Sequence, residues 1–279
     1  MQLMLRLKKI IINLSLYLTN LVLHKSFLKI NIFTPFTRKI ILLKMTKFKP
    51  EDIFKNSFFS TKDKLKNFSK YVRRQDLARF MVFFELFKKQ MNLKGSIVEC
   101  GVHQGGGIMT WAKLSSILEP YNYHRKIIGF DTFKGIPRLA KYDKNRKKLK
   151  KATFKEKFDI VGDIKNSIKE YDQNRFINNV SKIELIKGDA KKTIPNYIKR
   201  NRHLLISLLY FDFVVYEPTK IALKYFLPRM SKGSIIAFNE LNNEDWPGET
   251  TALLEKFNIK KFKIDCFPYE PNISYIVIK

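Results

Sequence analysis

Carboxylates follow four short apolar runs of the sequence, at positions that suit ligand binding and proton transfer. Glu99, Asp131, Asp189 and Asp212 each stand at the end of such a run or just after it. If the runs are parallel strands, their carboxyl ends meet at the edge of the sheet where open α/β sheets bind ligands. Carboxylates at that edge can accept hydrogen bonds from a ribose diol or an amine, or take a proton from a substrate.

The first run leads into a glycine-rich turn at residues 99–107. Gly101 allows a sharp turn, and the later glycines let a ligand approach backbone N–H groups at a helix start. The E-x-G-x-x-x-G spacing does not match the G-x-G-x-x-G dinucleotide fingerprint, which argues against a nicotinamide cofactor. We expect cofactor contacts from Glu99, Gly101, Val102, His103, Gly105 and Gly106.

Three further strand ends carry distinct expected roles. Asp131 with Thr132 lies about 30 residues after the glycine turn, as a βαβ unit requires, and is expected to bind the ribose; capping a helix is its alternative role. Asp189 with Ala190 suits recognition of an adenine amine, although an ordinary turn explains the pair equally well. Asp212 faces the reacting centre as a metal ligand, a cofactor contact or a general base.

A parallel sheet is needed to bring these acids together, and the apolar runs supply one. They alternate with helical segments, the pattern of a parallel sheet covered on both faces. The last two runs are joined by residues 268–272 alone, too short for a parallel crossover, so this pair is expected to be antiparallel. We therefore predict an α/β fold with a doubly wound seven-stranded sheet, mostly parallel with an antiparallel C-terminal strand. The strands are expected at residues 96–100, 126–130, 182–187, 204–211, 234–238, 261–267 and 273–278.

Several stretches together carry a resemblance that is more specific than any one motif. Residues 97–112, 129–137, 212–219 and 227–234 are similar to stretches of the macrocin O-methyltransferase family, the TylF and MycF group. The similarity covers residues 97–252, most of the predicted catalytic domain. It implies a class I, Rossmann-like methyltransferase fold and S-adenosyl-L-methionine as cofactor. The implied reaction is O-methylation of a hydroxyl on a sugar, glycoside or related small-molecule or polysaccharide acceptor.

The resemblance also implies roles for acids near the reacting centre. Asp212 or Glu240 would be the catalytic base, and Asp212, Asn239 and Glu240 would be the ligands of Mg²⁺. The chain departs from the family here, because Asn239 stands where an acid is common and Val214 replaces the second Asp of an Asp-x-Asp pair. Fewer charges weaken a site for a hard cation, so metal dependence stays open.

The segment after the predicted fifth strand, residues 242–250, opens the next helix. We expect Trp246 and Glu249 to face the acceptor, since an aromatic surface suits a sugar ring. Alternatively, Pro247 and Gly248 only shape the helix entrance and Trp246 packs inside.

Composition leaves a second enzymatic alternative open. The chain of 279 residues has 54 Lys and Arg against 25 Asp and Glu, a net charge of +29, and residues 138–157 hold ten basic residues. Such charge attracts nucleic acid or other anions, so RNA methylation is an alternative, but no RNA-binding motif accompanies it. An AT-biased genome would produce the same composition. The two cysteines imply no disulfide framework and suit a cytoplasmic protein.

The first 44 residues differ from the rest of the chain, because they contain eight Lys or Arg and no acid. Residues 10–24, the longest stretch free of Lys and Arg, are shorter than the ~20 apolar residues that a membrane span needs. Residues 1–44 are thus either a membrane-surface segment or an over-extended gene start before Met45. We expect a helical region at 45–95, with Phe80, Phe83, Phe84 and Phe87 on one face, and a methyltransferase domain at 96–279. A homodimer is plausible, and so is a non-catalytic protein that retains the fold.

Overall fold

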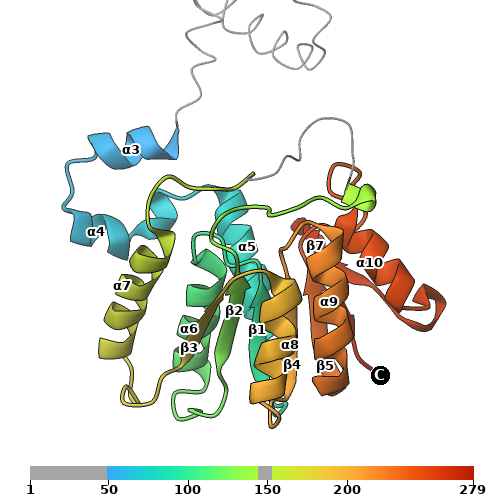
Figure 1. Ribbon diagram of the computed structural model, residues 1–279. Coiled ribbons are helices and arrows are strands. Elements are labelled where there is room, and N and C mark those ends of the chain that lie inside the picture. The colour runs from blue at the N-terminus through green and yellow to red at the C-terminus, as the bar shows by residue number, and fades with distance from the viewer. Residues whose placement is uncertain (1–48, 144–152) are drawn as a thin grey trace, which may run out of the picture. The chain divides into compact units, whose positions relative to one another are not determined.

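The computed structural model describes residues 49–143 and 153–279 (Figure 1). The chain divides into two compact units, residues 1–71 and 72–279, which are described separately. The predictions for residues 1–44 and for the basic residues 144–152 lie outside the described residues. Within the described ranges, no helix combines the length and apolar character needed to cross a membrane.

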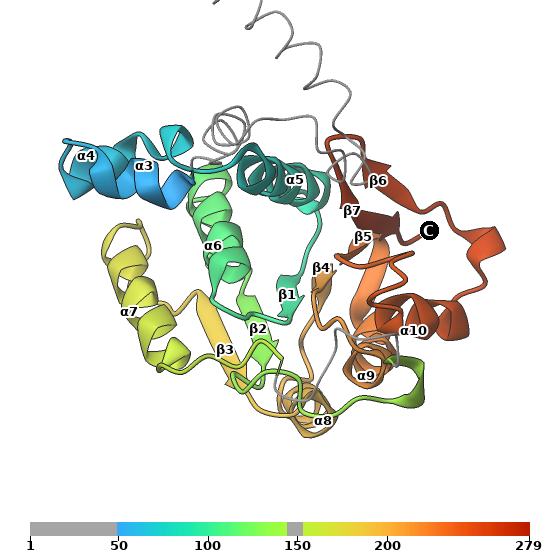
Figure 2. The ribbon, with the colours of Figure 1, turned by 90° about the horizontal axis from the view of Figure 1, so that it is seen from above.

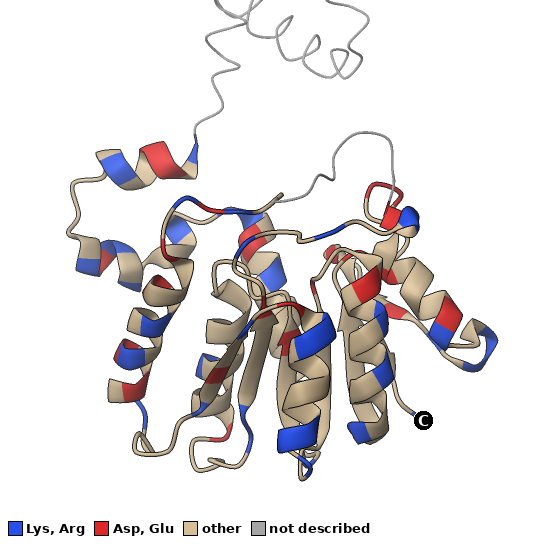
Figure 3. Cartoon of the chain, in the orientation of Figure 1, with Lys and Arg blue, Asp and Glu red and all other residues tan. Residues whose placement is uncertain are grey.

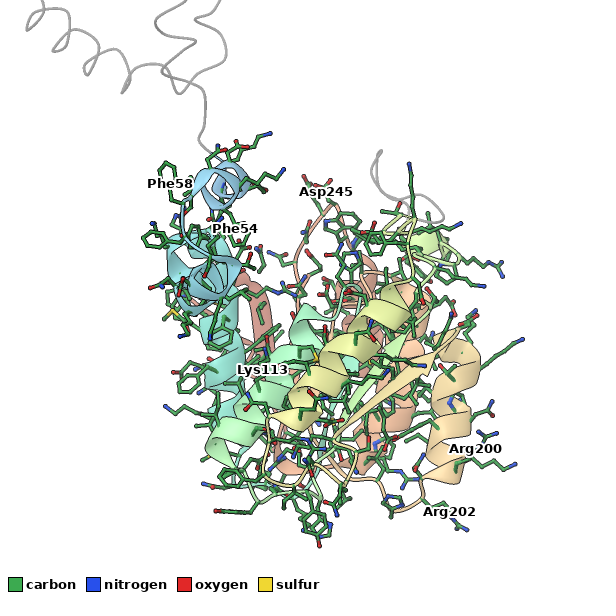
Figure 4. All side chains as sticks on the ribbon, turned by 90° about the vertical axis from the view of Figure 1, so that its left-hand side faces the viewer. Phe54, Phe58, Lys113, Arg200, Arg202 and Asp245 are labelled. Carbon is green, nitrogen blue, oxygen red and sulfur yellow. The ribbon has the colours of Figure 1, made fainter. Side chains whose placement is uncertain are left out.

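The described part of the first unit consists of short helices: α3 (Pro50–Asn56), α4 (Thr61–Lys66) and the 3₁₀ turn η2 (Phe68–Lys70). Ser60 caps α4 by accepting a hydrogen bond from the Asp63 N–H at 3.1 Å. The rings of Phe54 and Tyr71 pack edge to face at 5.3 Å. Phe58, in contrast, is fully exposed (Figure 4).

The second unit contains a seven-stranded sheet in the order β3-β2-β1-β4-β5-β7-β6. Strands β1 to β5 pair in parallel, whereas β7 is antiparallel to both β5 and β6. The predicted doubly wound sheet with an antiparallel C-terminal strand is confirmed. The strands are β1 (Ser96–Cys100), β2 (Ile127–Asp131), β3 (Ile183–Lys187), β4 (Ile206–Phe211), β5 (Met230–Phe238), β6 (Asp265–Phe267) and β7 (Glu270–Val277).

Helices cover both faces of the sheet (Figure 2). On one face lie α5 (Arg74–Gln90), α6 (Gly106–Leu118) and α7 (Ile160–Gln173), and on the other lie α8 (Ala190–Arg200), α9 (Tyr216–Phe226) and α10 (Gly248–Lys256). Each face has its own apolar core: Leu86 and Trp111 pack on the first, and Phe130 and Phe238 on the second. Every residue of β1 and β4 is buried, and both sequences are mostly apolar, as is typical of central parallel strands. The buried polar exceptions are Ser96, Glu99 and Ser207.

The phenylalanines expected on one helix face at residues 80–87 lie in helix α5. Phe83 and Phe87 are buried against the sheet layer, while Phe80 is 40% exposed. The helix therefore packs with the sheet, although the sequence grouped it with the preceding helical region. Arg125 holds the residues that follow α5 in place. Its guanidinium donates hydrogen bonds to the carbonyl oxygens of Met91 and Leu93, both at 2.9 Å.

The C-terminal hairpin is tighter than the sequence indicated. Strand β7 begins at Glu270, so the turn is Pro268 and Tyr269 alone. Strand β6 is shorter than predicted, because it begins at Asp265. The predicted first residue, Lys261, instead ends a 3₁₀ turn, η5 (Ile259–Lys261), whose cap Asn258 accepts from the Lys260 N–H at 3.2 Å. The antiparallel pairing itself is as expected.

Surface charge is mixed over most of the helices. Figure 3 shows Lys and Arg interspersed with Asp and Glu on α7, α9 and α10. Helix α8 carries Lys191, Lys192, Lys199 and Arg200 and no acid.

Candidate active site

A cavity of about 710 Å³ opens at the carboxyl ends of the parallel strands. Its walls come from the segments that follow β1, β2, β3 and β4, which the parallel pairing brings side by side. This is the edge where the sequence placed the ligand. The predicted site residues in its lining are Gly101, His103, Asp131, Thr132, Asp189, Ala190 and Asp212.

Gly101 allows the strand ends to meet. It has a φ of +103°, and a Cβ at this position would overlap the carbonyl oxygen of Asp212. The Gly101 N–H donates to Phe130 O at 2.9 Å, and the Asp212 N–H donates to Cys100 O at 2.7 Å. Only glycine permits both this backbone conformation and this close approach of β1 to β4.

Glu99, at the end of β1, is a buried acid with an incomplete set of partners. Its residue is 2% exposed, and its Oε2 has no hydrogen-bond partner among the described residues. Burial raises the pKa of Glu99 well above its ordinary value. A buried carboxylate oxygen without a partner is costly, so this position suits a cationic ligand group.

Asp131 joins the loops after β1 and β2. Its Oδ2 accepts from the backbone N–H of His103 at 2.8 Å, and its Oδ1 accepts from the N–H of Phe133 at 2.7 Å. His103 and Phe133 both have positive φ, +49° and +52°. Asp131 thus fixes two strained loops in the cavity wall rather than capping a helix, and each of its oxygens keeps a lone pair for a ligand hydroxyl.

Asp189 has a local structural role at the start of a helix, which differs from the ordinary turn considered as its alternative. It is the N-cap of α8, and its Oδ1 accepts from the Lys191 N–H at 2.9 Å. Asp189 and Ala190 nevertheless line the cavity, so capping does not remove them from the site.

Asp212, Asn239 and Glu240 come together, as the sequence predicted. Asn239 Nδ2 donates to Asp212 Oδ1 at 3.0 Å and to Glu240 Oε1 at 3.1 Å. The other oxygen of Asp212, Oδ2, accepts from Arg79 Nη2 at 2.8 Å. Burial raises the pKa of Asp212 above its ordinary value, while the charge and hydrogen bond of Arg79 oppose that rise.

Comparison with known proteins decides the family. The family described as Macrocin-O-methyltransferase (TylF) matches residues 36–259. The chain belongs to this family. It is therefore an S-adenosylmethionine-dependent O-methyltransferase, as predicted. Among the curated proteins, no sequence matches the chain.

Solved structures agree with this assignment. The O-methyltransferase is similar to CalS11, calicheamicin methyltransferase, with 29% identity and a TM-score of 0.79 over 88% of this chain and 93% of that one. Apo CalS11, described as a TDP-rhamnose 3'-O-methyltransferase, gives 27% identity and a TM-score of 0.72 over 88% and 95%. The O-methyltransferase NovP shares the fold, with 18% identity and a TM-score of 0.50 over 72% and 80%.

The residues of this O-methyltransferase fit S-adenosylmethionine. The unpartnered Oε2 of Glu99 suits the ammonium group of the cofactor, and Asp131 lies in the wall where the ribose is expected. Gly106, at the start of α6, leaves open space around its Cα. That space lets a ligand approach the backbone N–H groups at the beginning of the helix.

The same residues do not fit Mg²⁺. Asn239 has a single side-chain oxygen, which accepts from Arg79 Nη1 at 2.8 Å, and its NH₂ group lies between the carboxylates of Asp212 and Glu240. Over residues 49–143 and 153–279, no group of three or more His, Cys, Asp or Glu side chains is placed to hold a metal ion. A hard cation needs converging oxygens, which this arrangement does not offer.

Arg79 is the residue of the O-methyltransferase site that the sequence analysis missed. Besides Asp212 and Asn239, it donates to the hydroxyl oxygen of Tyr210 at 2.8 Å. The sequence did contain a signal for it: Arg79 is four residues before Phe83, on the face of α5 whose buried residues are all uncharged. A charge on such a face needs a partner, and the acids that follow β4 and β5 were the candidates.

Trp246 contacts an aromatic residue of the cavity wall, Phe154. Its ring is 6.0 Å from that of Phe154, which is in turn 5.7 Å from the ring of His103 in the cavity wall. Gln104 Nε2 donates to Glu156 Oε1 at 2.8 Å, which holds this segment to the loop after β1. The loop that carries Asp245 stands at the end of the domain opposite Arg200 and Arg202 (Figure 4).

Glu249 does not lie where the sequence analysis expected it. It was predicted to face the acceptor, but it is fully buried, and its oxygens accept from the backbone N–H groups of Val214 and Glu240 at 2.9 and 3.3 Å. The reason is helical periodicity: Glu249 shares the inward face of α10 with Ala252 and Leu253. Burial raises the pKa of Glu249 to about 8.

Proposed function

We propose that this O-methyltransferase transfers the methyl group of S-adenosylmethionine to a hydroxyl of a sugar. One observation carries the proposal: the carboxylate of Asp212, held by Arg79 and Asn239, lines the same cavity as Asp131 and the glycine turn. A proton acceptor therefore stands next to the predicted cofactor site. The sugar is inferred from CalS11, which is described as a TDP-rhamnose 3'-O-methyltransferase.

The cofactor contacts are proposed from the cavity lining and from the family to which the chain belongs. Glu99, Val102, Gly105 and Gly106 are not part of the lining itself. Glu99 binds the ammonium group, Asp131 with Thr132 binds the ribose, and Asp189 with Ala190 lies against the adenine. Gly101, Val102, His103, Gly105 and Gly106 form the turn that approaches the methionine part. When bound, the cofactor supplies a methyl group that is already activated on a sulfonium, so the protein has mainly to align the acceptor and exclude water.

Asp212 is the proposed base. The acceptor oxygen forms its bond to the methyl carbon as the carbon–sulfur bond breaks, the electron pair stays on sulfur, and the hydroxyl proton passes to Asp212. Glu240, the other predicted base, is held by amides: its Oε1 and Oε2 accept from Asn239 and from Asn243, the latter at 2.6 Å. We assign Glu240 to orienting Asn239. No step uses a metal.

The acceptor is proposed to lie between the cavity and the aromatic pair Phe154 and Trp246, since ring faces suit the C–H groups of a sugar. The other expectations about partners stay predictions. They are homodimer formation, a cytoplasmic location and contact of residues 1–44 with a membrane surface. RNA methylation would be indicated by retention of the chain on RNA that falls with rising salt.

Calorimetric titration of the full chain with S-adenosylmethionine and S-adenosylhomocysteine tests the cofactor site. We expect saturable binding that weakens about tenfold or more in Asp131→Ala, because hydrogen bonds from two ribose hydroxyls to a charged group are lost. Asp163→Ala, on the exposed face of α7, is the matched control and should bind as the wild type does. Folded protein that binds neither compound would refute the proposal.

A screen of acceptors follows from the same experiment. Nucleoside diphosphate sugars, free glycosides and RNA are each incubated with radiolabelled S-adenosylmethionine, and label transferred to the acceptor is counted. Transfer to a sugar hydroxyl supports the proposal, whereas transfer confined to RNA contradicts the assigned acceptor while leaving the cofactor site intact.

A further inference from the structure

Arg79 occupies the position where a cation would bridge Asp212, after β4, and Asn239, after β5. Its guanidinium donates to Asp212 Oδ2 and to Asn239 Oδ1, both at 2.8 Å. These two residues are two of the three ligands that the family resemblance assigns to Mg²⁺. A positive group built into the chain thus already holds one oxygen from each of these two residues, in place of a metal ion.

The orientation of Asn239 is fixed by its neighbours. A guanidinium can only donate hydrogen bonds and ionised carboxylates can only accept them. The amide oxygen must therefore face Arg79, and the NH₂ group must face Asp212 and Glu240. Reversing the amide would place N–H against N–H and oxygen against two carboxylates. Asn239 and Arg79 together form a set of donors directed at the acids, the reverse of a metal site.

Arg79 also keeps unused donors within reach of the site. Its bonds to Asp212, Asn239 and Tyr210 use three of its five N–H groups, which leaves the Nε–H and one Nη1–H without a partner among the described residues. The side chain is 37% exposed, whereas that of Asp212 is 24% exposed. A ligand oxygen placed beside Asp212 can therefore receive a hydrogen bond from the same guanidinium.

We propose that Arg79 takes the place of the divalent cation: it holds Asp212 and Asn239 in position and donates a hydrogen bond to the acceptor oxygen. The role assigned toward the acceptor rests on the proposed function. A fixed positive charge beside the acceptor stabilises the negative charge that develops on its oxygen as the proton leaves. Because the charge belongs to a side chain, the reaction needs no added metal ion.

The test is Mn²⁺ binding by the full chain, followed by the loss of the paramagnetic resonance signal of free Mn²⁺. Four proteins are compared: the wild type, Arg79→Ala, the double variant Arg79→Ala with Asn239→Asp, and Arg74→Ala. Arg74 lies on the first turn of the same helix and is exposed, so it is the matched control. Thermal unfolding of each protein establishes that it is folded.

We expect the wild type and Arg74→Ala to bind no Mn²⁺ near Asp212. The double variant should gain one site, because it removes the guanidinium and replaces the amide with a third carboxylate. Its dissociation constant should be on the order of 0.1 to 1 mM, the range of weak oxygen-ligand sites. Arg79→Ala alone should gain a weaker site or none.

Two results would overturn the proposal. One is a single Mn²⁺ site in the wild type that the Asp212→Asn substitution removes. The other is a folded double variant that binds no Mn²⁺, which would mean that Arg79 does not stand in a cation position. Should the double variant fail to fold, the wild-type titration with and without Asp212→Asn still decides the matter.

The titration is independent of the proposed function. Mn²⁺ binding is measured without cofactor or acceptor, so an error in the assigned acceptor does not change its result. Calorimetry with S-adenosylmethionine is run in parallel on Arg79→Ala, which should retain cofactor affinity within about threefold because its contacts lie on the acceptor side. If the wild type binds no S-adenosylmethionine, the proposed function is refuted, and the Mn²⁺ result is unaffected.

Discussion

Glu249 holds the backbone of Val214 in a strained conformation beside the active site. The Val214 N–H donates to Glu249 Oε1 at 2.9 Å, and Val214 has a φ of +66°. A β-branched residue in the left-handed region costs about 1–3 kcal/mol and persists only where its surroundings enforce it. Since the other oxygen of Glu249 accepts from the Glu240 N–H, one buried carboxylate braces the segments after both β4 and β5.

Glu249 should make the stability of the protein depend on pH. Burial raises its pKa to about 8 in the folded chain from an unfolded value of 4.5. Its contribution to stability is therefore fully present below the unfolded pKa and is lost as pH rises toward 8. Relative to Glu249→Gln, the wild type should lose about 4 kcal/mol of unfolding free energy between pH 5 and pH 9. Urea unfolding at pH 5, 7 and 9 measures this difference.

Which of the two proteins is more stable, the wild type or Glu249→Gln, should also change with pH. A glutamine places an NH₂ group against one of the two backbone N–H donors, so Glu249→Gln should be the less stable protein at pH 5 by about 1–3 kcal/mol. The control is Glu255→Gln on the same helix. Hydrogen bonds from Lys220 and Tyr216 lower the pKa of the exposed Glu255, so the sign of its pH dependence is opposite. A pH-independent difference for Glu249→Gln would show that Glu249 keeps its charge throughout.

Two glycines of the same turn should respond differently to alanine. Gly101→Ala should destabilise the protein by at least about 2 kcal/mol, because its φ is +103° and the new Cβ would overlap the Asp212 carbonyl oxygen. Gly106 begins α6 with open space around it, so Gly106→Ala should change stability by less than about 1 kcal/mol. Urea unfolding compares them. Equal losses would contradict the account of the turn, and weaker cofactor binding by a stable Gly106→Ala would report a direct contact there.

Glu99→Gln should separate cofactor binding from folding. The substitution removes a buried ionisable group whose Oε2 has no partner among the described residues, so stability should be unchanged or higher. If Oε2 binds the ammonium group of S-adenosylmethionine, affinity should fall about 10- to 100-fold. Calorimetry measures the affinity, with Glu184→Gln on β3 as control, since Glu184 accepts from Tyr197 outside the cavity lining. Undiminished affinity in Glu99→Gln would exclude this contact.

The sheet could be predicted from the sequence because each buried strand appears there as a short apolar run. Strand β1 was predicted at its observed bounds, and β2 was displaced by one residue. Where pairing extends a strand past its apolar run, the sequence does not predict the strand's first residue. Strand β5 begins at Met230, four residues before its predicted start, because Met230 pairs with Ile206. Ser231 and Lys232 are polar and are typical of a loop. Such an extension depends on the neighbouring strand, which no local pattern contains.

The site was predictable where a residue ends a strand and was not where a distant helix contributes to it. The parallel sheet dictates that Asp131 and Asp212 share an edge, so their meeting followed from the fold. The contact between Arg79 and Asp212 joins residues 133 apart in sequence, and it depends on how α5 packs on the sheet. Glu249 was misplaced for a similar reason, because the inward face of α10 is set by its packing against α9 and not by the loop before it.

Asp212→Asn should abolish methyl transfer while the cofactor still binds. An amide cannot take the acceptor proton, so turnover should fall by about 10²- to 10⁴-fold, the usual contribution of a general base. The variant should remain folded but somewhat less stable, because its NH₂ group must face either Arg79 or the amide of Asn239, both of which donate to the carboxylate. Asp163→Asn on α7 is the control, and turnover is measured as label transferred to the acceptor that the screen identifies.

The pH dependence of turnover is a second test of Asp212 as the base. Asp212 must be ionised to accept a proton, and burial raises its pKa above the ordinary value against the opposing charge of Arg79. Turnover should therefore fall as pH decreases through that raised pKa, and the residual activity of Asp212→Asn should lose this limb. If the variant kept both normal turnover and the acidic limb, the proton would go to another group. Glu240, whose pKa burial also raises and which shares Asn239 with Asp212, would then be the residue to replace next.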